Sequence, residues 1–108
     1  MSELRHEPRD PITRKAHLNH DGAWVPCLLQ DVSAQGFGIM CARSLSVGQI
    51  VELKCEPYPG KAFRCQIEIR YISDSFAGVL ITEIDDAGRR LCAQLMADYH
   101  SDRKLANR

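Results

Sequence analysis

The chain has 108 residues, 44% hydrophobic and 26% charged, which suffices to bury one hydrophobic core and not two. Its 14 basic and 14 acidic side chains cancel, so the chain lacks the basic excess of a protein that coats nucleic acid. No apolar stretch approaches the roughly 20 residues of a membrane-spanning helix, and the charged first residues are unlike a signal peptide. We therefore expect one cytoplasmic domain.

Residues 1–11 are polar and include Pro8 and Pro11. Proline lacks a backbone N–H and disfavours the helical conformation of the residue before it, so this stretch is predicted to be an extended arm. The arm carries two arginines, Arg5 and Arg9. Taken alone, such a segment is more often a loose tail than a functional element, because chain termini are seldom tied down.

Residues 12–84 alternate between apolar and polar side chains in six short stretches, the pattern of half-buried antiparallel strands. We expect strands at about residues 12–20, 23–32, 37–42, 51–56, 63–71 and 76–84. Asp21-Gly22 is a strong hairpin signal between the first two strands. Pro26 predicts an edge or a bulge in the second strand. The alternation of the fifth strand predicts that Phe63 and Tyr71 point inward.

The period changes to that of a helix after Asp85 and Asp86, either of which can cap the helix N-terminus. Apolar residues at helical spacing predict a helix at about residues 86–103 whose apolar face packs on the rest of the domain. Residues 12–108 are thus predicted to form a mainly β fold, a small six-stranded antiparallel β-barrel with a C-terminal α-helix. Side chains fill the interior of so small a barrel, so function is expected on its outside.

The sequence offers little support for catalysis or metal binding. The cysteines form no C-x-x-C pair, and their apolar neighbours predict buried free thiols at Cys27, Cys41, Cys55, Cys65 and Cys92. Ser33 has no base next to it in sequence, and neither G-x-G-x-x-G, H-E-x-x-H nor a phosphate-binding P-loop is found. We expect no enzyme, no metal site and no cofactor.

The most distinctive stretch is Gln30–Gly38, where one apolar run enters a polar corner and a second apolar run leaves it. Asp31 and Ser33 are turn formers, because their side chains hydrogen-bond nearby backbone groups. Gly36 can adopt a positive φ or let a ligand approach the backbone closely. By itself this stretch is typical of an ordinary hairpin connection.

An Arg-x-x-x-Arg in the arm, at Arg5 and Arg9, precedes an Asp-x-Ser-x-x-Gly at Asp31, Ser33 and Gly36. Together these motifs resemble the PilZ family, and the resemblance extends over nearly the whole chain to the Leu-rich helix. It implies a receptor for the bacterial second messenger cyclic di-GMP, with these five residues as the binding site. It also implies an adaptor that engages an effector protein in motility, biofilm formation or virulence.

The chemistry of the motif residues suits a guanine dinucleotide. A guanidinium can bond bidentately to guanine O6 and N7, grip phosphate oxygens or stack on a base. The Asp31 carboxylate can accept from the Watson–Crick edge of guanine, and the Ser33 hydroxyl can donate to a phosphate. Many relatives have a further basic residue where this chain has Leu4. That difference favours one ligand per domain, unless Arg14 or Lys15 supplies the charge.

Two other functions stay open on the sequence. One is a protein-interaction domain of the same fold that binds no nucleotide, although such relatives usually lack the two arginines. The other is a binder of single-stranded nucleic acid, which would stack bases on exposed aromatic rings in a basic groove. Aromatic residues make up only 6% of this chain and its charges balance, which disfavours the second alternative.

Overall fold

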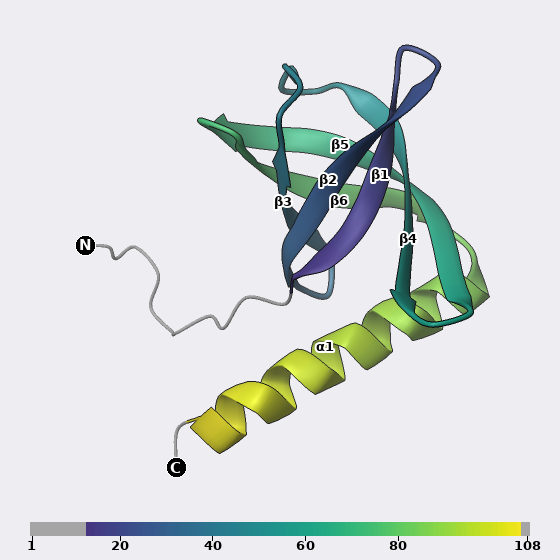
Figure 1. Cartoon of the computed structure of the whole chain (residues 1–108), viewed down its shortest axis with the longest axis vertical. Coiled ribbons are helices and arrows are strands. Elements are labelled where there is room, and N and C mark those ends of the chain that lie inside the picture. Colours follow the sequence, from purple (N-terminus) through teal and green to yellow (C-terminus); the bar gives the residue numbers. More distant parts are fainter. Residues whose placement is uncertain (1–12, 107–108) are drawn as a thin grey trace.

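The computed structural model describes the backbone of residues 13–106 and the side chains of residues 13–98 (Figure 1). The elements are β1 (Arg14–His20), β2 (Ala23–Val32), β3 (Gly36–Cys41), β4 (Ile50–Tyr58), β5 (Lys61–Ser73), β6 (Phe76–Ile84) and α1 (Asp86–Ala106). The strands form a closed barrel in the order β1-β2-β3-β6-β5-β4, and neighbouring strands run antiparallel. The predicted mainly β fold with a C-terminal helix is confirmed.

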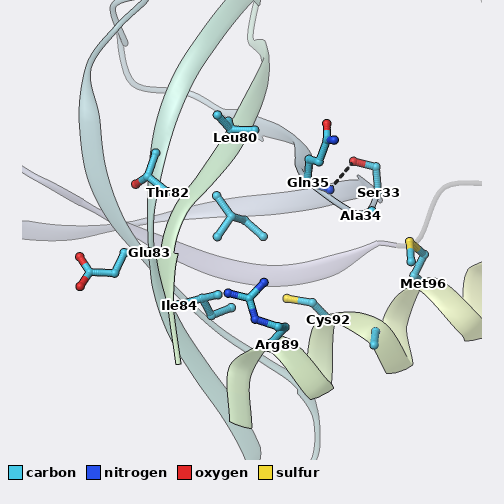
Figure 2. Close-up of a pocket in the computed structure, with 12 residues that line it drawn as sticks. Ser33, Ala34, Gln35, Leu80, Thr82, Glu83, Ile84, Arg89, Cys92 and Met96 are labelled. Carbon is cyan, nitrogen blue, oxygen red and sulfur yellow. Dashed lines mark hydrogen bonds between the residues drawn. The ribbon is translucent and has the colours of Figure 1, made fainter. Parts of the chain in front are cut away.

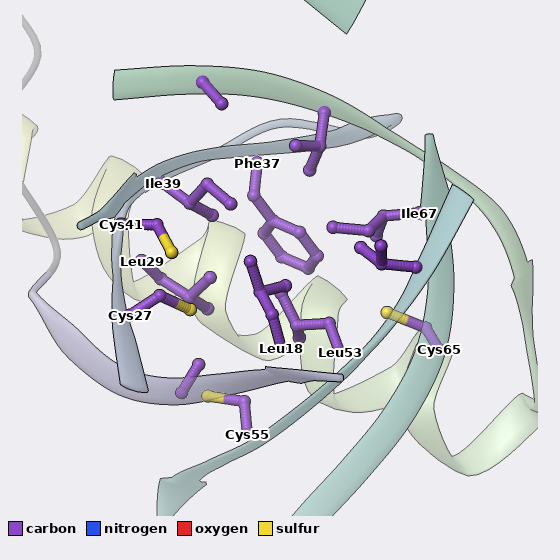
Figure 3. Close-up of a cluster of buried hydrophobic side chains, with 14 of the residues drawn as sticks. Leu18, Cys27, Leu29, Phe37, Ile39, Cys41, Leu53, Cys55, Cys65 and Ile67 are labelled. Atoms are coloured by element: carbon purple, nitrogen blue, oxygen red, sulfur yellow. The ribbon is translucent and has the colours of Figure 1, made fainter. Parts of the chain in front are cut away.

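The barrel interior is filled by the apolar side chains that alternate along the strands (Figure 3). Leu18, Ile39, Leu53, Ile67 and Ile69 are among the largest side chains that are fully buried. Among the side chains that the structure describes, none that is polar or charged is buried. Because this interior offers a ligand neither space nor polar groups, a binding site has to lie on the outer surface.

The cysteines are free thiols, and the four that lie in strands are buried. Burial raises the pKa of Cys27, Cys55 and Cys65 to about 12 and that of Cys92 to about 11. A thiol with so high a pKa stays protonated near neutral pH and is a poor nucleophile. The four strand cysteines are therefore small apolar side chains of the core, as the sequence predicted, whereas Cys92, which was also predicted to be buried, is only partly buried on the helix.

Helix α1 crosses one end of the barrel, where it packs against β5 and β2 (Figure 1). The Asp85 carboxylate caps the helix by accepting a hydrogen bond from the backbone N–H of Gly88 at 2.7 Å. Leu95, which is 1% exposed, is the helical side chain that joins the barrel core. The predicted start of the helix, its cap and its packing on the barrel are thus confirmed.

A β-bulge interrupts the regular alternation of β5. Ile69 pairs with Val79 on β6, as the alternation predicts. The next pair joins Tyr71 to Gly78, so Arg70 is the extra residue of the bulge. One extra residue reverses the two faces of a strand, and Tyr71 is accordingly 55% exposed. The sequence-based prediction that Tyr71 points inward is therefore wrong.

A second bulge lies in β2 at Gln30, between the pairs that Leu29 and Asp31 form with β3. It places Asp31 on the outer face, while Val32 is buried again on the inner face. Pro26 lies just beyond the end of the pairing between β2 and β3, so the proline occupies a locally free edge of β2. This agrees with the edge position that the sequence predicted for the proline.

Candidate functional site

A row of four residues crosses the outer face of the barrel on four adjacent strands. Asp31 on β2 pairs with Gly38 on β3, and Gly38 pairs with Gly78 on β6. Gly78 in turn pairs with Tyr71 on β5. The two bulges bring the carboxylate and the phenol ring into this row, and its two middle positions have no side chain. It is referred to below as the Asp31–Tyr71 row.

The side chains at the two ends of the row lie over the glycines between them. A Cβ atom on Gly38 would lie 2.8 and 2.9 Å from the two carboxylate oxygens of Asp31. A Cβ atom on Gly78 would lie 2.2 Å from the nearest ring carbon of Tyr71. Glycine at these two positions is therefore what lets a carboxylate and an aromatic ring lie against the strands.

The Asp31–Tyr71 row lines a shallow depression of about 220 Å³ on the outer surface, which Ser33, Gly36 and Arg70 also border. Phe76 supports the ring of Tyr71 from the side, with 6.1 Å between the ring centroids. The depression thus brings a carboxylate, a hydroxyl, a guanidinium and an aromatic ring together. These are the groups that recognise a base and a phosphate.

Ser33 shapes the turn between β2 and β3. Its Oγ accepts hydrogen bonds from the backbone N–H groups of Gln35 at 3.3 Å and Gly36 at 3.2 Å. The backbone N–H of Ser33 donates to the Gly36 carbonyl at 2.9 Å. The hydroxyl proton makes a longer contact of 3.4 Å with the same carbonyl. A ligand can therefore accept a hydrogen bond from this hydroxyl while the shorter hydrogen bonds that hold the turn stay in place.

Gly36 has a structural role that the sequence did not reveal. The glycines with positive φ in the described part of the chain are Gly22, Gly48 and Gly60, so of the two possibilities that the sequence left open for Gly36, a positive φ does not apply. A Cβ atom on Gly36 would lie 1.9 Å from the carbonyl oxygen of Val79 on β6. The two strands approach each other too closely there for any side chain, so the backbone that comes close to Gly36 is the protein's own.

Arg5 and Arg9, the arginines of the predicted arm, lie outside the described residues. The structure does show where the arm joins the barrel. Arg14, the first residue of β1, pairs with Leu29 on β2, two residues before Asp31. Asp31 lies about 7 Å along β2 from Leu29 and five extended residues span up to about 17 Å, so the chain between Arg9 and Arg14 is long enough to reach the Asp31 end of the row.

A second and larger hollow, of about 440 Å³, lies between α1 and β6 and ends at the Ser33 turn (Figure 2). Its walls are largely aliphatic, with Ile84 and Met96 among them, and Arg89 and Glu83 are its charged groups. Among the described residues that line it, none has an aromatic ring on which a base could stack. The depression along the Asp31–Tyr71 row is therefore the better candidate for a nucleotide.

The structure brings together three of the predicted site residues, Asp31, Ser33 and Gly36, at one side of the depression. Sequence analysis missed Tyr71 and the two glycines of the row. A glycine inside a strand often marks a place where another group approaches the backbone closely, so Gly38 and Gly78 could have been identified from the sequence as candidates. Their pairing with each other depends on the register of β3 and β6, and the outward position of Tyr71 depends on the bulge.

Comparison with known protein families identifies the class of protein. The PilZ domain family matches residues 3–98, so the chain belongs to the PilZ domain family. PilZ domains are binding and adaptor domains of cyclic di-GMP signalling rather than enzymes. No curated protein matches the chain. Within residues 13–106, no helix is long and apolar enough to cross a membrane, and no three His, Cys, Asp or Glu side chains are placed to hold a metal ion.

Proposed function

We propose that this protein is a cyclic di-GMP receptor whose ligand lies on the Asp31–Tyr71 row and is held there by the arginines of the arm. The observation that carries the proposal is the position of Asp31, whose carboxylate lies over a glycine floor beside an exposed aromatic ring. Binding brings the arm against the barrel and so creates a surface for an effector protein. The receptor is thus an adaptor without catalytic activity of its own.

Each group of the site has a counterpart in the dinucleotide. The Asp31 carboxylate accepts hydrogen bonds from the N1–H and N2–H groups of a guanine, and the Ser33 hydroxyl donates to a phosphate oxygen. The exposed face of the Tyr71 ring stacks on a base, a contact worth about 1–3 kcal/mol in complexes of single-stranded nucleic acid. Arg5 and Arg9 bind phosphate or the O6 and N7 edge of guanine.

Calorimetric titration of the full chain with cyclic di-GMP tests the proposal, with GTP and cyclic AMP as controls. We expect saturable binding of one cyclic di-GMP per chain, because Leu4 supplies no charge for a second ligand and the Arg14 guanidinium is bound to Pro57. The two control nucleotides should not bind at the same concentration, since GTP has a single guanine and cyclic AMP has none. If cyclic di-GMP does not bind either, the protein is a ligand-independent interaction domain.

Replacing Gly78 by Ala should weaken cyclic di-GMP binding by about 1 kcal/mol, or about fivefold in Kd, because the new Cβ displaces the Tyr71 ring. The free energy of unfolding should change by less than about 1 kcal/mol, since the Tyr71 ring, which is 55% exposed, can move into solvent. Calorimetry gives the Kd, and urea unfolding gives the stability. Tyr71→Phe is the matched control, because it keeps the ring and should bind like the wild type. Wild-type affinity of Gly78→Ala would remove Tyr71 from the site.

A further inference from the structure

Arg14 lies where the arm joins the barrel, and its side chain reaches away from the Asp31–Tyr71 row. Its Nε donates a hydrogen bond to the carbonyl oxygen of Pro57, near the end of β4, at 3.1 Å. Its guanidinium lies 5.8 Å from the ring centroid of Tyr58, within range of a cation–π contact. Because β1 lies between β2 and β4, Arg14 fastens the start of β1 to β4, on the side of β1 opposite to β2 and Asp31.

The Tyr58 ring is in turn fastened to α1. Its hydroxyl donates a hydrogen bond to Oδ2 of Asp98, and Nε2 of Gln94 donates to Oδ1 of the same carboxylate at 3.3 Å. Burial, followed by the hydrogen bond to Asp98, raises the pKa of Tyr58 to about 12, so its hydroxyl stays a donor near neutral pH. Arg14, Tyr58 and Asp98 thus form one series of contacts from the start of β1 to α1, referred to below as the Arg14–Asp98 series.

We propose, on the basis of the function proposed above, that Arg14 is a positioning residue for cyclic di-GMP: it fixes the origin of the arm without touching the ligand. Arg9 precedes Arg14 by five residues, so the position of Arg14 decides which part of the barrel surface Arg9 reaches. When the contacts of Arg14 are lost, the first residues of β1 gain conformational freedom. Ligand binding then has to order these residues as well, and it becomes weaker.

The same series of contacts connects the ligand to α1. A ligand that holds the arm also holds Arg14 on Tyr58, and Tyr58 holds Asp98. Binding therefore strengthens the attachment of α1 to the barrel, and by linkage a tighter attachment of α1 favours binding. Since α1 lies across the end of the barrel, ligand occupancy changes a surface other than the binding site itself (Figure 1).

Titration of Arg14→Ala with cyclic di-GMP at several salt concentrations tests the positioning role. We expect the Kd to rise about fivefold, while the slope of log Kd against log salt stays that of the wild type, because no phosphate contact is lost. Loss of a phosphate contact, as proposed for Arg9, would lower that slope. Lys61→Ala is the matched control, because it removes one positive charge from the β4–β5 hairpin that Arg14 contacts and should leave the Kd within about twofold.

Amide hydrogen exchange of residues 94–98, with and without cyclic di-GMP, tests the connection to α1. In the wild type, the ligand should slow exchange in this stretch. Tyr58→Phe keeps the ring beside the Arg14 guanidinium and loses the hydroxyl, which is hydrogen-bonded to Asp98 and also interacts with the Arg14 side chain. This variant should lose the ligand-dependent slowing, and by linkage its Kd should rise by about the factor by which the ligand slows exchange in the wild type. A purely structural role of Tyr58 would change exchange equally with and without ligand.

The results separate this inference from the proposed function. If the wild type binds cyclic di-GMP and Arg14→Ala binds equally tightly, or with a lower salt slope, Arg14 is not a positioning residue and the receptor function stands. If the ligand leaves exchange of residues 94–98 unchanged in the wild type, the connection to α1 is wrong. If the wild type ignores cyclic di-GMP, both proposals fail. Urea unfolding of each variant verifies that the protein under titration is folded.

Discussion

Replacing Arg9 by Ala should weaken cyclic di-GMP binding by about 1–3 kcal/mol, or roughly 5- to 150-fold in Kd. A guanidinium that bonds bidentately to guanine or phosphate contributes about this much, and alanine retains none of it. The barrel should keep its stability, since its core is built from residues of the strands and of α1. Calorimetric titration measures the Kd, and urea unfolding without ligand measures the stability.

Arg90→Ala is the matched control for Arg9→Ala. It removes the same charge from α1, beside the β4–β5 hairpin, and should leave the Kd within about twofold because it disturbs only the long-range field. Equal losses of affinity in the two variants would mean that binding responds to net charge rather than to a contact with the arm. Wild-type affinity of Arg9→Ala would exclude the arm from the mechanism.

Replacing Gly36 by Ala should destabilise the fold by about 3 kcal/mol, which lowers the Tm of a domain of this size by roughly 10–20 °C. The new Cβ would lie 1.9 Å from the carbonyl oxygen of Val79. This oxygen belongs to the backbone of β6, so it cannot rotate away as a side chain can, and β3 and β6 have to separate. Thermal and urea unfolding of the ligand-free protein measure the loss.

The control for Gly36→Ala is Gly78→Ala, the same substitution on the adjacent strand. Its Cβ meets a ring carbon of Tyr71 instead of a carbonyl, and an exposed ring can swing aside. We expect Gly78→Ala to lose less than about 1 kcal/mol of stability, so the difference between the variants isolates the backbone contact. If Gly36→Ala were as stable as the wild type, the close contact with Val79 would not explain why this position is a glycine, and close approach of a ligand to the backbone would be the alternative explanation.

The sequence alone determined the order and kind of the elements, because alternation and helical spacing are local properties of one stretch. Residues 23–32 and 76–84 were predicted as strands, and β2 and β6 have these same bounds. The apolar positions Phe63, Cys65 and Ile67 were predicted to face inward, and all three are buried. The corner with Asp31 and Ser33 was also visible, since turn chemistry depends on neighbouring residues.

Only the tertiary structure decided which residues share the outer face. The bulges at Gln30 and Arg70 are properties of a strand and its partner, so a strict period of two, carried along one strand, misplaced Tyr71. Likewise, Gly36 is a glycine because of Val79, a residue distant in sequence that strand pairing brings close. A sequence read along one strand does not contain the register with the next strand, and that register assembles the Asp31–Tyr71 row.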